Sequence, residues 1–245
     1  MIDTDLQNTS VLKRFSGRHT EYRQEKDGRL EKIKPLPAYL LQRYNGWHAA
    51  DWNENSGWYK RLMTEGQRPR AMLISCCDSR VNMGSVFGAE AGDFFIHRNI
   101  ASLVPPYKPD GNHHGTGAAI EYAVTALHVA HLIIVGHSGC GGVAGCHAMC
   151  SGAAPDMEES SSFVGRWMDI LRPGYERVRN SGDDAAQIAA LEKEAVMVSL
   201  ENLISYPFVS DARQAGDLSL HGLWIDVGSG ELQQYDAPAQ KFVSV

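Results

Sequence analysis

Short apolar runs alternate with a helical pattern in the middle of the chain, and their order predicts the fold. The runs AMLIS (71–75), FFIH (94–97) and LIIVG (132–136) have the length and residue types of buried strands. Between the second and third runs, residues 114–131 place apolar side chains at helical spacing. Continuous apolar runs are typical of parallel strands that are covered on both faces, so we expect a βαβ unit.

The C-terminal part of the chain predicts two more helices and a hairpin. Residues 162–171 have the pattern of a short helix, and residues 187–205 have that of a long one. Residues 218–236 alternate, turn at GSG and alternate again, which is typical of a hairpin or an edge strand. Together these segments predict the α/β class, with a mostly parallel central sheet flanked by helices.

The N-terminal part lacks such apolar runs and is polar, rich in aromatic residues and inclined to helix. The segment 56–66 predicts a short helix, with Ser56 as its N-cap and Gly66 as its end. We therefore expect an N-terminal helical arm (1–65), which packs on the main domain or on a partner chain, followed by an α/β domain (66–245) that carries the chemistry.

Composition and charge exclude several functions. The 245 residues are 43% hydrophobic, enough for one sizeable core, and the formal net charge is −6. Binding to nucleic acid or to an anionic membrane relies on basic surface, so neither partner is expected. The N-terminus lacks the pattern of a secretory signal, and no uninterrupted apolar stretch reaches the roughly 18 residues of a spanning helix. These features predict a cytoplasmic location.

The cysteines favour reduced thiols or metal ligation over a disulfide framework, because their number is odd and no export signal is present. Two of them lie in the stretch CCDSR, directly after the run 71–75. In an extended chain, residues two apart point to the same side. Cys76, Asp78 and Arg80 then share one face. Cys77 points to the other.

A second motif, HSGC, follows the run 132–136 and contributes His137 and Cys140 in a glycine-rich turn that we expect to open a helix. Both motifs fall beyond the carboxyl ends of strands, where parallel sheets bind ligands. A helix N-terminus lowers the pKa of a nearby thiol and so favours the thiolate. Cys76, His137 and Cys140 supply two thiolates and an imidazole. This set suits tetrahedral zinc, with a fourth position free for water or for Asp78.

Other interpretations of these residues stay open on spacing alone. The zinc site could be closed and structural rather than catalytic. GCHAMC brings together Cys146, His147 and Cys150 as a competing ligand set, although a helical neighbourhood favours packed thiols. GHSGC is similar to the nucleophile elbow G-x-S-x-G of serine hydrolases and would make Ser138 the nucleophile, although Cys140 stands where that pattern has glycine.

The ordered motifs resemble the β-class carbonic anhydrases, in particular their plant-like branch. CCDSR, HRNIA and GHSGCGG carry the resemblance, and EGQRP, GTGAAIEYAV and EKEAVMVSLENLISYPFV extend it over roughly residues 55–236. It implies a zinc lyase that hydrates CO2 reversibly to bicarbonate and a proton, with one Zn2+ per chain on Cys76, His137 and Cys140. It also implies that the N-terminal arm embraces a second subunit, in a homodimer or a multiple of dimers, with the pocket at the dimer seam.

Substrate contacts carry over from the same resemblance. Gln67 matches a glutamine that hydrogen-bonds the substrate, and the other positions form the walls of the pocket. The expected substrate-binding residues are Gln67, Phe95, Ile100, Tyr122 and Gly141.

The expected mechanism uses the carboxylate beside the first ligand. Zinc lowers the pKa of bound water, so hydroxide forms near neutral pH and attacks CO2. Asp78 orients that water, and Arg80 holds Asp78 in a bidentate pair that keeps it off the metal. One branch of the family closes the site with this aspartate and has a bicarbonate pocket that uses a tryptophan and a glycine. This chain has Leu73 and Ser75 there, although Arg98 is retained, so we expect a constitutively open site.

Further expectations concern the surroundings of the site. His113 and His114 assist proton release by titrating near neutral pH. Cys77 is a small buried thiol at a position where the family often has serine. The alternative functions are a related zinc enzyme acting on CS2 or COS, a serine hydrolase using Ser138, and a non-catalytic zinc-stabilised module.

Overall fold

The structure is a computed structural model and describes residues 34–111, 114–158 and 163–245. The chain divides into two compact units, and the boundary falls between Gln67 and Arg68, close to the predicted end of the arm. None of the helices in the described ranges is long and apolar enough to cross a membrane.

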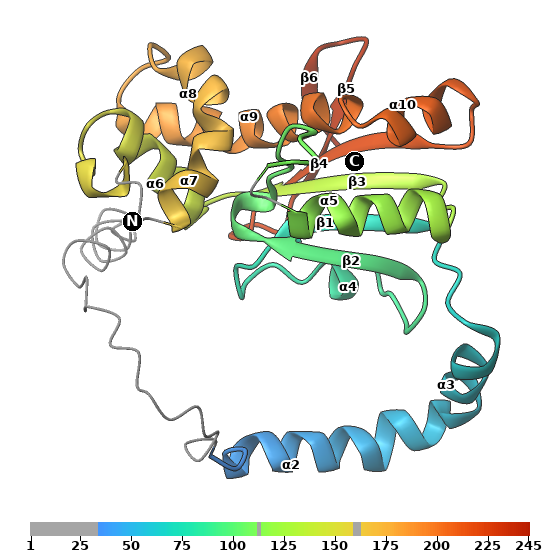
Figure 1. The fold of residues 1–245 in the computed structure, drawn as a ribbon. Coiled ribbons are helices and arrows are strands. Elements are labelled where there is room, and N and C mark those ends of the chain that lie inside the picture. The colour runs from blue at the N-terminus through green and yellow to red at the C-terminus, as the bar shows by residue number, and fades with distance from the viewer. Residues whose placement is uncertain (1–33, 112–113, 159–162) are drawn as a thin grey trace, which may run out of the picture. The chain divides into compact units, whose positions relative to one another are not determined.

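The N-terminal unit is helical throughout most of its described part. α2 (Ala38–Trp47), the π-helical η1 (His48–Trp52) and α3 (Asn53–Glu65) follow one another without a break in the helical backbone (Figure 1). The prediction that Ser56 caps a helix is wrong. Ser56 lies inside α3, where its hydroxyl donates to the carbonyl of Asn53, because the chain upstream is already helical. Gly66 ends the helix as predicted, with a φ of +79° that favours glycine.

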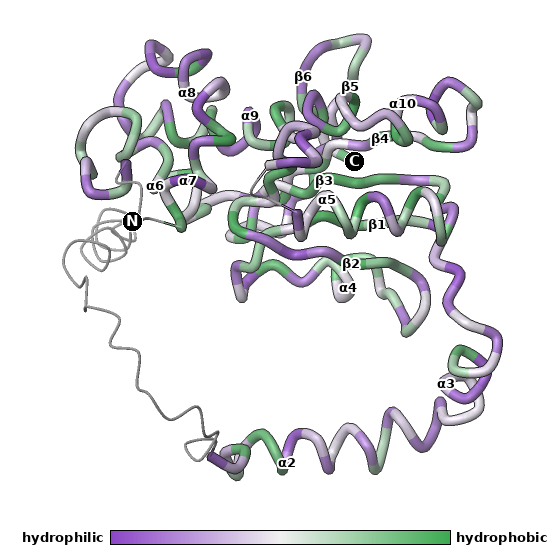
Figure 2. The backbone as a smooth tube through the Cα atoms, in the orientation of Figure 1, coloured by the Kyte–Doolittle hydropathy of each residue, from purple (hydrophilic) through white to green (hydrophobic). Residues whose placement is uncertain are grey.

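The helices of this unit expose many apolar side chains. No residue of α2, η1 or α3 is buried, and apolar stretches are visible along α2 (Figure 2). The exposed large hydrophobic residues of this unit are Leu36, Tyr39, Leu40, Leu41, Tyr44, Trp47, Trp58 and Met63. An apolar surface of this kind is typical of a segment that another protein surface covers.

The second unit contains a six-stranded sheet in the order β2-β1-β3-β4-β5-β6. The strands β1 (Ala71–Cys76), β2 (Phe94–Asn99), β3 (His131–His137) and β4 (Ser219–Ile225) are parallel. β5 (Leu232–Asp236) and β6 (Lys241–Ser244) continue the sheet antiparallel. The predicted α/β class, the three apolar strands and the 218–236 hairpin are confirmed.

Helices cover the sheet on the face that carries Met72, Ile74, Leu132 and Ile134. On this face lie α5 (His114–Glu121) with its π-helical continuation η3 (Tyr122–Ala126), α9 (Asp184–Ile204) and α10 (Pro207–Gln214) (Figure 1). The long helix predicted at 187–205 is confirmed. The helix predicted over 114–131 ends earlier, because the chain leaves the helix after Ala126 and His128 adopts a φ of +52°.

A second helical layer lies beyond the carboxyl ends of the strands. Its members are α6 (Gly141–Cys150), η4 (Pro155–Glu158), α7 (Phe163–Met168), η5 (Asp169–Leu171) and α8 (Arg172–Val178). These helices and part of α9 form a core cluster that includes Cys76 and Cys140. On the other face of the sheet, α4 (Met83–Val86) packs through Met83 against Leu73 and Val135. The metal-binding motifs therefore lie between the sheet and the second layer.

Candidate metal centre

Two adjacent parallel strands bring the predicted ligands together. Cys76 is the last residue of β1, His137 is the last residue of β3, and Cys140 is the residue that precedes α6. One donor atom from each of the three lies within 4.8 Å of the others. All three side chains are buried. The short turn between His137 and Cys140 contains Gly139 with a φ of +65°, a backbone conformation that favours glycine.

The hydrogen bonding of His137 leaves one ring nitrogen free for a metal. Its Nδ1 lies 3.0 Å from the carbonyl oxygen of Ser138, which can only accept. Nδ1 therefore carries the proton, and Nε2 carries a lone pair. Nε2 is buried and has no hydrogen-bond partner among the described residues. A buried lone pair beside two thiols is what a thiolate–imidazole zinc site requires, so the residues fit this metal.

The two thiols are electrostatically unequal. Contact with the Cys140 thiol, followed by His137 and backbone amides, lowers the pKa of Cys76 to about 4. The same contact and burial raise the pKa of Cys140. The amide of Ala101 donates to the Cys76 Sγ at 3.3 Å from a left-handed backbone conformation, with a φ of +61°. Ionising the second thiol requires a compensating positive charge, which a divalent cation supplies.

Asp78 and Arg80 form a bidentate pair next to the ligands. The Arg80 Nε donates to Asp78 Oδ1 at 2.9 Å, and Nη2 donates to Oδ2 at 2.7 Å. Nη2 also donates to the carbonyl of Gly139 at 2.8 Å, in the turn of the second motif. The hydrogen bonds that Arg80 donates to the carboxylate lower the pKa of Asp78 to about 2. The carboxylate is therefore ionised at neutral pH, with both oxygens engaged by one arginine.

The predicted extended geometry after Cys76 is wrong, although the predicted pairing of Asp78 with Arg80 is present. The strand ends at Cys76, and a turn follows in which the Val81 amide donates to the Asp78 carbonyl. The Arg80 amide donates to Asp78 Oδ1 in the same turn. The turn brings the two side chains together because the aspartate carboxylate caps it.

The prediction that Cys77 is buried is also wrong. Its amide donates to the carbonyl of Asn99 at 2.9 Å, but its side chain is exposed. Cys77 lies beyond the end of β1 and lines an open recess of about 400 Å³ with Ile100, His114 and other residues. The alternation of side chains along a strand predicted that Cys77 points away from the ligands. Its burial would also have required another element to cover it on that side.

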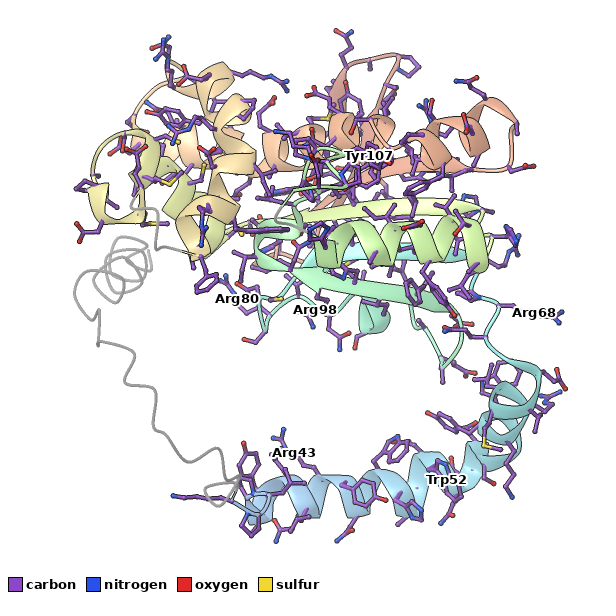
Figure 3. The ribbon with its side chains drawn as sticks, in the orientation of Figure 1. Arg43, Trp52, Arg68, Arg80, Arg98 and Tyr107 are labelled. Atoms are coloured by element: carbon purple, nitrogen blue, oxygen red, sulfur yellow. The ribbon has the colours of Figure 1, made fainter. Side chains whose placement is uncertain are left out.

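Arg98, the one position retained from the regulatory pocket of the other branch, binds the main chain of the first motif. Its Nε donates to the carbonyl of Cys76, and its Nη2 donates to the carbonyls of Asp78 and Val81. Arg98 and Arg80 both lie at the carboxyl edge of the sheet (Figure 3). Arg98 therefore fixes the loop that carries Cys76 and Asp78.

Glu192 is a functional candidate that motif reasoning missed. It lies on α9, is buried, and accepts a hydrogen bond from the amide of Cys140 at 3.2 Å. Burial raises its pKa. Gly136 allows α9 to come this close, because a Cβ there would lie 2.7 Å from Val196 Cγ2 and 3.2 Å from the Glu192 carbonyl. The signal in the sequence was a charged residue among apolar positions of a long helix.

The expected substrate-binding residues do not all gather around this centre. Gly141 begins α6 directly after Cys140, and Ile100 follows β2, with its carbonyl bound by Trp167 Nε1. The rings of Phe95 and Tyr122 contact each other, with centroids 5.8 Å apart. Phe95 pairs with Met72, four residues before Cys76. At the rise of a β-strand, this places Phe95 about 13 Å along the sheet from the ligand end. Gln67 belongs to the N-terminal unit.

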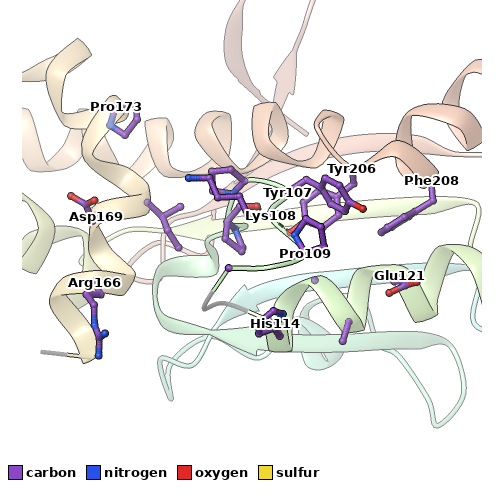
Figure 4. A pocket seen from close by; sticks show the side chains of 16 residues that line it. Tyr107, Lys108, Pro109, His114, Glu121, Arg166, Asp169, Pro173, Tyr206 and Phe208 are labelled. Carbon is purple, nitrogen blue, oxygen red and sulfur yellow. Dashed lines mark hydrogen bonds between the residues drawn. The ribbon is translucent and has the colours of Figure 1, made fainter. Parts of the chain in front are cut away.

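His114 lies between two openings in the surface. It lines the recess that contains Cys77 and also a cavity of about 550 Å³ that is bordered by other residues of α5. Figure 4 shows this cavity with His114 and Glu121 of α5 facing Tyr107 and Tyr206. His113 lies outside the described residues.

The geometry does not support the serine-hydrolase interpretation. The Ser138 hydroxyl donates to Asp226 Oδ1 at 3.2 Å and accepts from the Val227 amide at 3.0 Å. A nucleophilic serine needs an adjacent base. Within the described ranges, no imidazole nitrogen hydrogen-bonds to this hydroxyl. Ser138 instead ties the turn after β3 to the loop after β4.

The competing ligand set on α6 is divided between different contacts. His147 Nε2 lies 3.0 Å from Gln187 Oε1, and Cys146 and Cys150 contact each other. Among the residues that the structure describes, Cys76, His137 and Cys140 are the cluster of three metal-binding side chains.

The chain is similar to known proteins in both sequence and structure. The family model described as carbonic anhydrase matches residues 71–232. Beta carbonic anhydrase 3 of Arabidopsis thaliana is 33% identical over 238 residues, covering 95% of this chain and 88% of the relative. The solved β-carbonic anhydrase CcaA is 29% identical with a TM-score of 0.76, over 84% of this chain and 91% of that one. A structure from a study of two tetrameric β-carbonic anhydrases from Sordaria macrospora is 28% identical with a TM-score of 0.69, over 80% and 94%. The chain therefore belongs to the β-class carbonic anhydrase family.

Proposed function

We propose that the protein catalyses the reversible hydration of CO2 to bicarbonate and a proton, with zinc held by Cys76, His137 and Cys140. The observation that carries this proposal is the buried cluster of two thiols and an imidazole whose Nε2 lacks a partner among the described residues. Two strand ends and a helix start fix the three donors, so they form one site without the need for another protein chain. Family membership supplies the reaction.

Bound zinc supplies a Lewis acid that lowers the pKa of water towards neutrality. The residues of the chain then have to orient the reacting water and leave room for CO2. Asp78 is suited to accept a hydrogen bond from that water, because its pKa of about 2 keeps it ionised. Arg80 fixes the direction of the carboxylate through two hydrogen bonds.

The same pair supports a constitutively open site. Both oxygens of Asp78 are engaged by Arg80, which competes with any bond from the carboxylate to the metal. Leu73 is fully buried in β1 where a regulatory pocket would need a tryptophan, and Ser75 is buried next to it. Arg98 is occupied by three main-chain carbonyls. A bicarbonate pocket that pulls Asp78 onto the metal would therefore lack its tryptophan and its glycine in this chain, and its arginine is already engaged.

A second copy of the chain completes the pocket in this proposal. Phe95 lies too far along the sheet to line the metal centre of its own chain, as the strand register indicates, and the ring of Tyr122 contacts Phe95. β2 is an edge strand, and Ile96, Ile100 and Tyr122 beside it are 48%, 41% and 50% exposed. A partner that packs against this edge brings aromatic residues to the site and covers the apolar surface.

The N-terminal arm has the properties of a dimer-embracing segment. Its apolar side chains are exposed within its own unit, and an arm that wraps a partner buries them. The related Sordaria structures are tetrameric, which accords with a multiple of dimers. Deletion of residues 1–67 is expected to reduce the mass measured by light scattering to that of a monomer. If the shortened protein keeps the oligomeric mass of the full chain, the arm is not needed for the interface.

Proton release is proposed to pass His114. The side chain of His114 lines both the recess beside Cys77 and the larger cavity, so it connects the two openings for the passage of a proton. His114→Ala is expected to slow hydration at low buffer concentration, and added imidazole is expected to restore it. Equal rates in the variant and the wild type at low buffer would exclude this role.

Zinc content and stopped-flow CO2 hydration test the proposal together. The wild type is expected to hold one zinc per chain and to be active, and Asp78→Ala is expected to keep the zinc and lose most of the rate. Zinc without hydration would leave a structural site or an enzyme acting on CS2 or COS, which the same assay can examine with those substrates. Activity without zinc that a serine-directed reagent blocks would favour a hydrolase.

A further inference from the structure

A pair of thiols lies in the C-terminal half of the helix that begins at the metal centre. Cys146 and Cys150 are four residues apart on α6, and their Sγ atoms are 3.9 Å apart. Side chains at this spacing share one face of a helix. Their neighbour His147 is bound to Gln187. The pair is therefore a dithiol without a third ligand among the described residues.

The two thiols differ in accessibility. Cys146 is fully buried, and its Sγ lies 3.5 Å from the carbonyl oxygen of Met168, to which it donates. Cys150 is the last residue of α6 and is only partly buried. A reagent from solvent therefore reaches Cys150 first, and the buried Cys146 thiol lies next to it.

The charges around Cys150 are compatible with a reactive thiolate. The contact with the Cys146 thiol and then the guanidinium of Arg172 lower the pKa of Cys150, and its partial burial opposes them. Arg172 also pairs with Asp169 and Glu158, whose carboxylates oppose this effect. The same contact raises the pKa of Cys146. Cys150 is thus the nucleophile of the pair, and Cys146 retains its proton until a second step.

The end of α6 provides room for a bond between the sulfurs. A disulfide needs Cβ atoms about 3.5–4.5 Å apart, whereas helix neighbours at this spacing are about 5–6 Å apart. The last turn therefore has to move. Cys150 ends the helix, Ser151 follows as its C-cap, and Gly152 leaves it with a φ of +81°. The movement affects the terminal bond from the Ser151 amide to the His147 carbonyl rather than the interior of the helix.

We propose that Cys146 and Cys150 form a reversible oxidation site, which a low-molecular-weight disulfide such as glutathione disulfide converts to an intrahelical disulfide. The Cys150 thiolate attacks one sulfur of glutathione disulfide, and one glutathione thiolate leaves. Cys146 then gives its proton to that thiolate and attacks the Cys150 sulfur, and the second glutathione leaves. Two protein thiols lose two electrons, and glutathione disulfide is reduced to two glutathione molecules.

Cleavage at methionine separates the two cysteines for the test. Zinc-loaded protein is treated with glutathione disulfide, the remaining thiols are alkylated in denaturant, and cyanogen bromide cuts after Met149 and Met157. Cys150 then lies on peptide 150–157, and Cys146 lies on fragment 84–149. The expected result is that the two pieces stay linked until a reductant separates them. Exposed Cys77 is the control within the chain, because it is expected to keep its glutathione as a stable adduct.

Two variants test the order of the steps. Cys146→Ser is expected to trap glutathione on peptide 150–157, and the serine hydroxyl can still donate to Met168. Cys150→Ser is expected to leave Cys146 without an adduct, because that thiol is buried. The proposal is overturned if Cys150 of the wild type does not react or keeps its glutathione. It is also overturned if the pieces stay linked in Cys146→Ser, or if Cys146 is modified in Cys150→Ser.

Discussion

Replacing Arg80 with glutamine tests whether this arginine keeps Asp78 off the metal. The arginine donates two bonds to the carboxylate and one to the carbonyl of Gly139. Glutamine cannot form the bidentate pair. We expect Asp78 in Arg80→Gln to turn towards the metal centre and close the fourth position, so that kcat/KM for CO2 hydration falls.

The pKa of Asp78 sets the size of the expected effect. It lies at about 2, against an ordinary value of 3.8, which means that the surroundings favour the ionised carboxylate by roughly 2.5 kcal/mol. The side chain of Arg80 is the largest cause, and the Arg80 amide, which Arg80→Gln retains, adds to it. The Arg80 side chain is 47% exposed, so solvent screening reduces this preference to about 1–2 kcal/mol. The equilibrium between open and closed sites then shifts by a factor of about 5–30 towards the closed one.

Stopped-flow hydration and zinc retention against a chelator measure this shift together. A closed site gains a fourth protein ligand, so Arg80→Gln is expected to lose activity while holding zinc at least as firmly as the wild type. Loss of the bond to Gly139 alone would instead loosen the turn and speed zinc release. The matched control is Arg177→Gln, because Arg177 also pairs with carboxylates and is 43% exposed, but lies on α8. Wild-type rates in Arg80→Gln, with Asp78 clear of zinc in a crystal structure, would refute the reasoning.

Three further predictions concern the ligands, the core and the sheet. Cys76→Ala is expected to abolish zinc binding and hydration, whereas Cys77→Ser is expected to keep both, as measured by metal content and rate; zinc loss in the second variant would contradict the ligand assignment. Glu192→Ala leaves the buried amide of Cys140 without its acceptor, so the free energy of unfolding in urea is expected to fall by about 1–3 kcal/mol. Glu192→Gln keeps an acceptor and is expected to lose less stability. Equal losses in the two variants would assign the effect to packing. Burial and then the neighbouring His131 lower the pKa of His221 below 6.5, so the folded state resists protonation and loses stability as pH falls below that value. His221→Gln is expected to reduce this loss of stability, as measured by urea midpoints at a series of pH values below 6.5. If the midpoints of the variant depend on pH as steeply as those of the wild type, His221 is not the source of the loss.

The parallel half of the sheet and the three ligands could be predicted because each follows from a strong local signal. AMLIS and LIIVG are apolar except for Ser75, since β1 and β3 lie in the middle of the sheet, and β1 is buried along its whole length. Adjacent parallel strands end side by side, so the residues that follow them meet without further information. β6 gave no comparable signal, because it is a short edge strand whose residues are partly exposed.

The errors near the metal centre arise where the chain leaves regular structure. Alternation holds only while the strand continues, and the turn from Asp78 to Val81 ended it. The exposure of Cys77 depended on which element lies beside the end of β1, a long-range property that its neighbours in sequence do not encode. The cap assigned to Ser56 failed for a similar reason, since the signal of a helix start has no meaning where the preceding residues are already helical.

The contacts that hold the ligand turns were the hardest to predict, because they are made to main-chain atoms rather than to side chains. Arg98 donates to three carbonyls around the first motif, Arg80 donates to the Gly139 carbonyl, and Glu192 accepts from the Cys140 amide. A main-chain acceptor or donor exists at almost every position and therefore leaves no pattern in the sequence. The short motifs specify which atoms bind zinc, but β2, α9 and the turn after β1 determine where these atoms lie. Substitutions in those elements should therefore change metal retention without changing any ligand, whereas substitutions of Asp78 should change the rate with the metal retained.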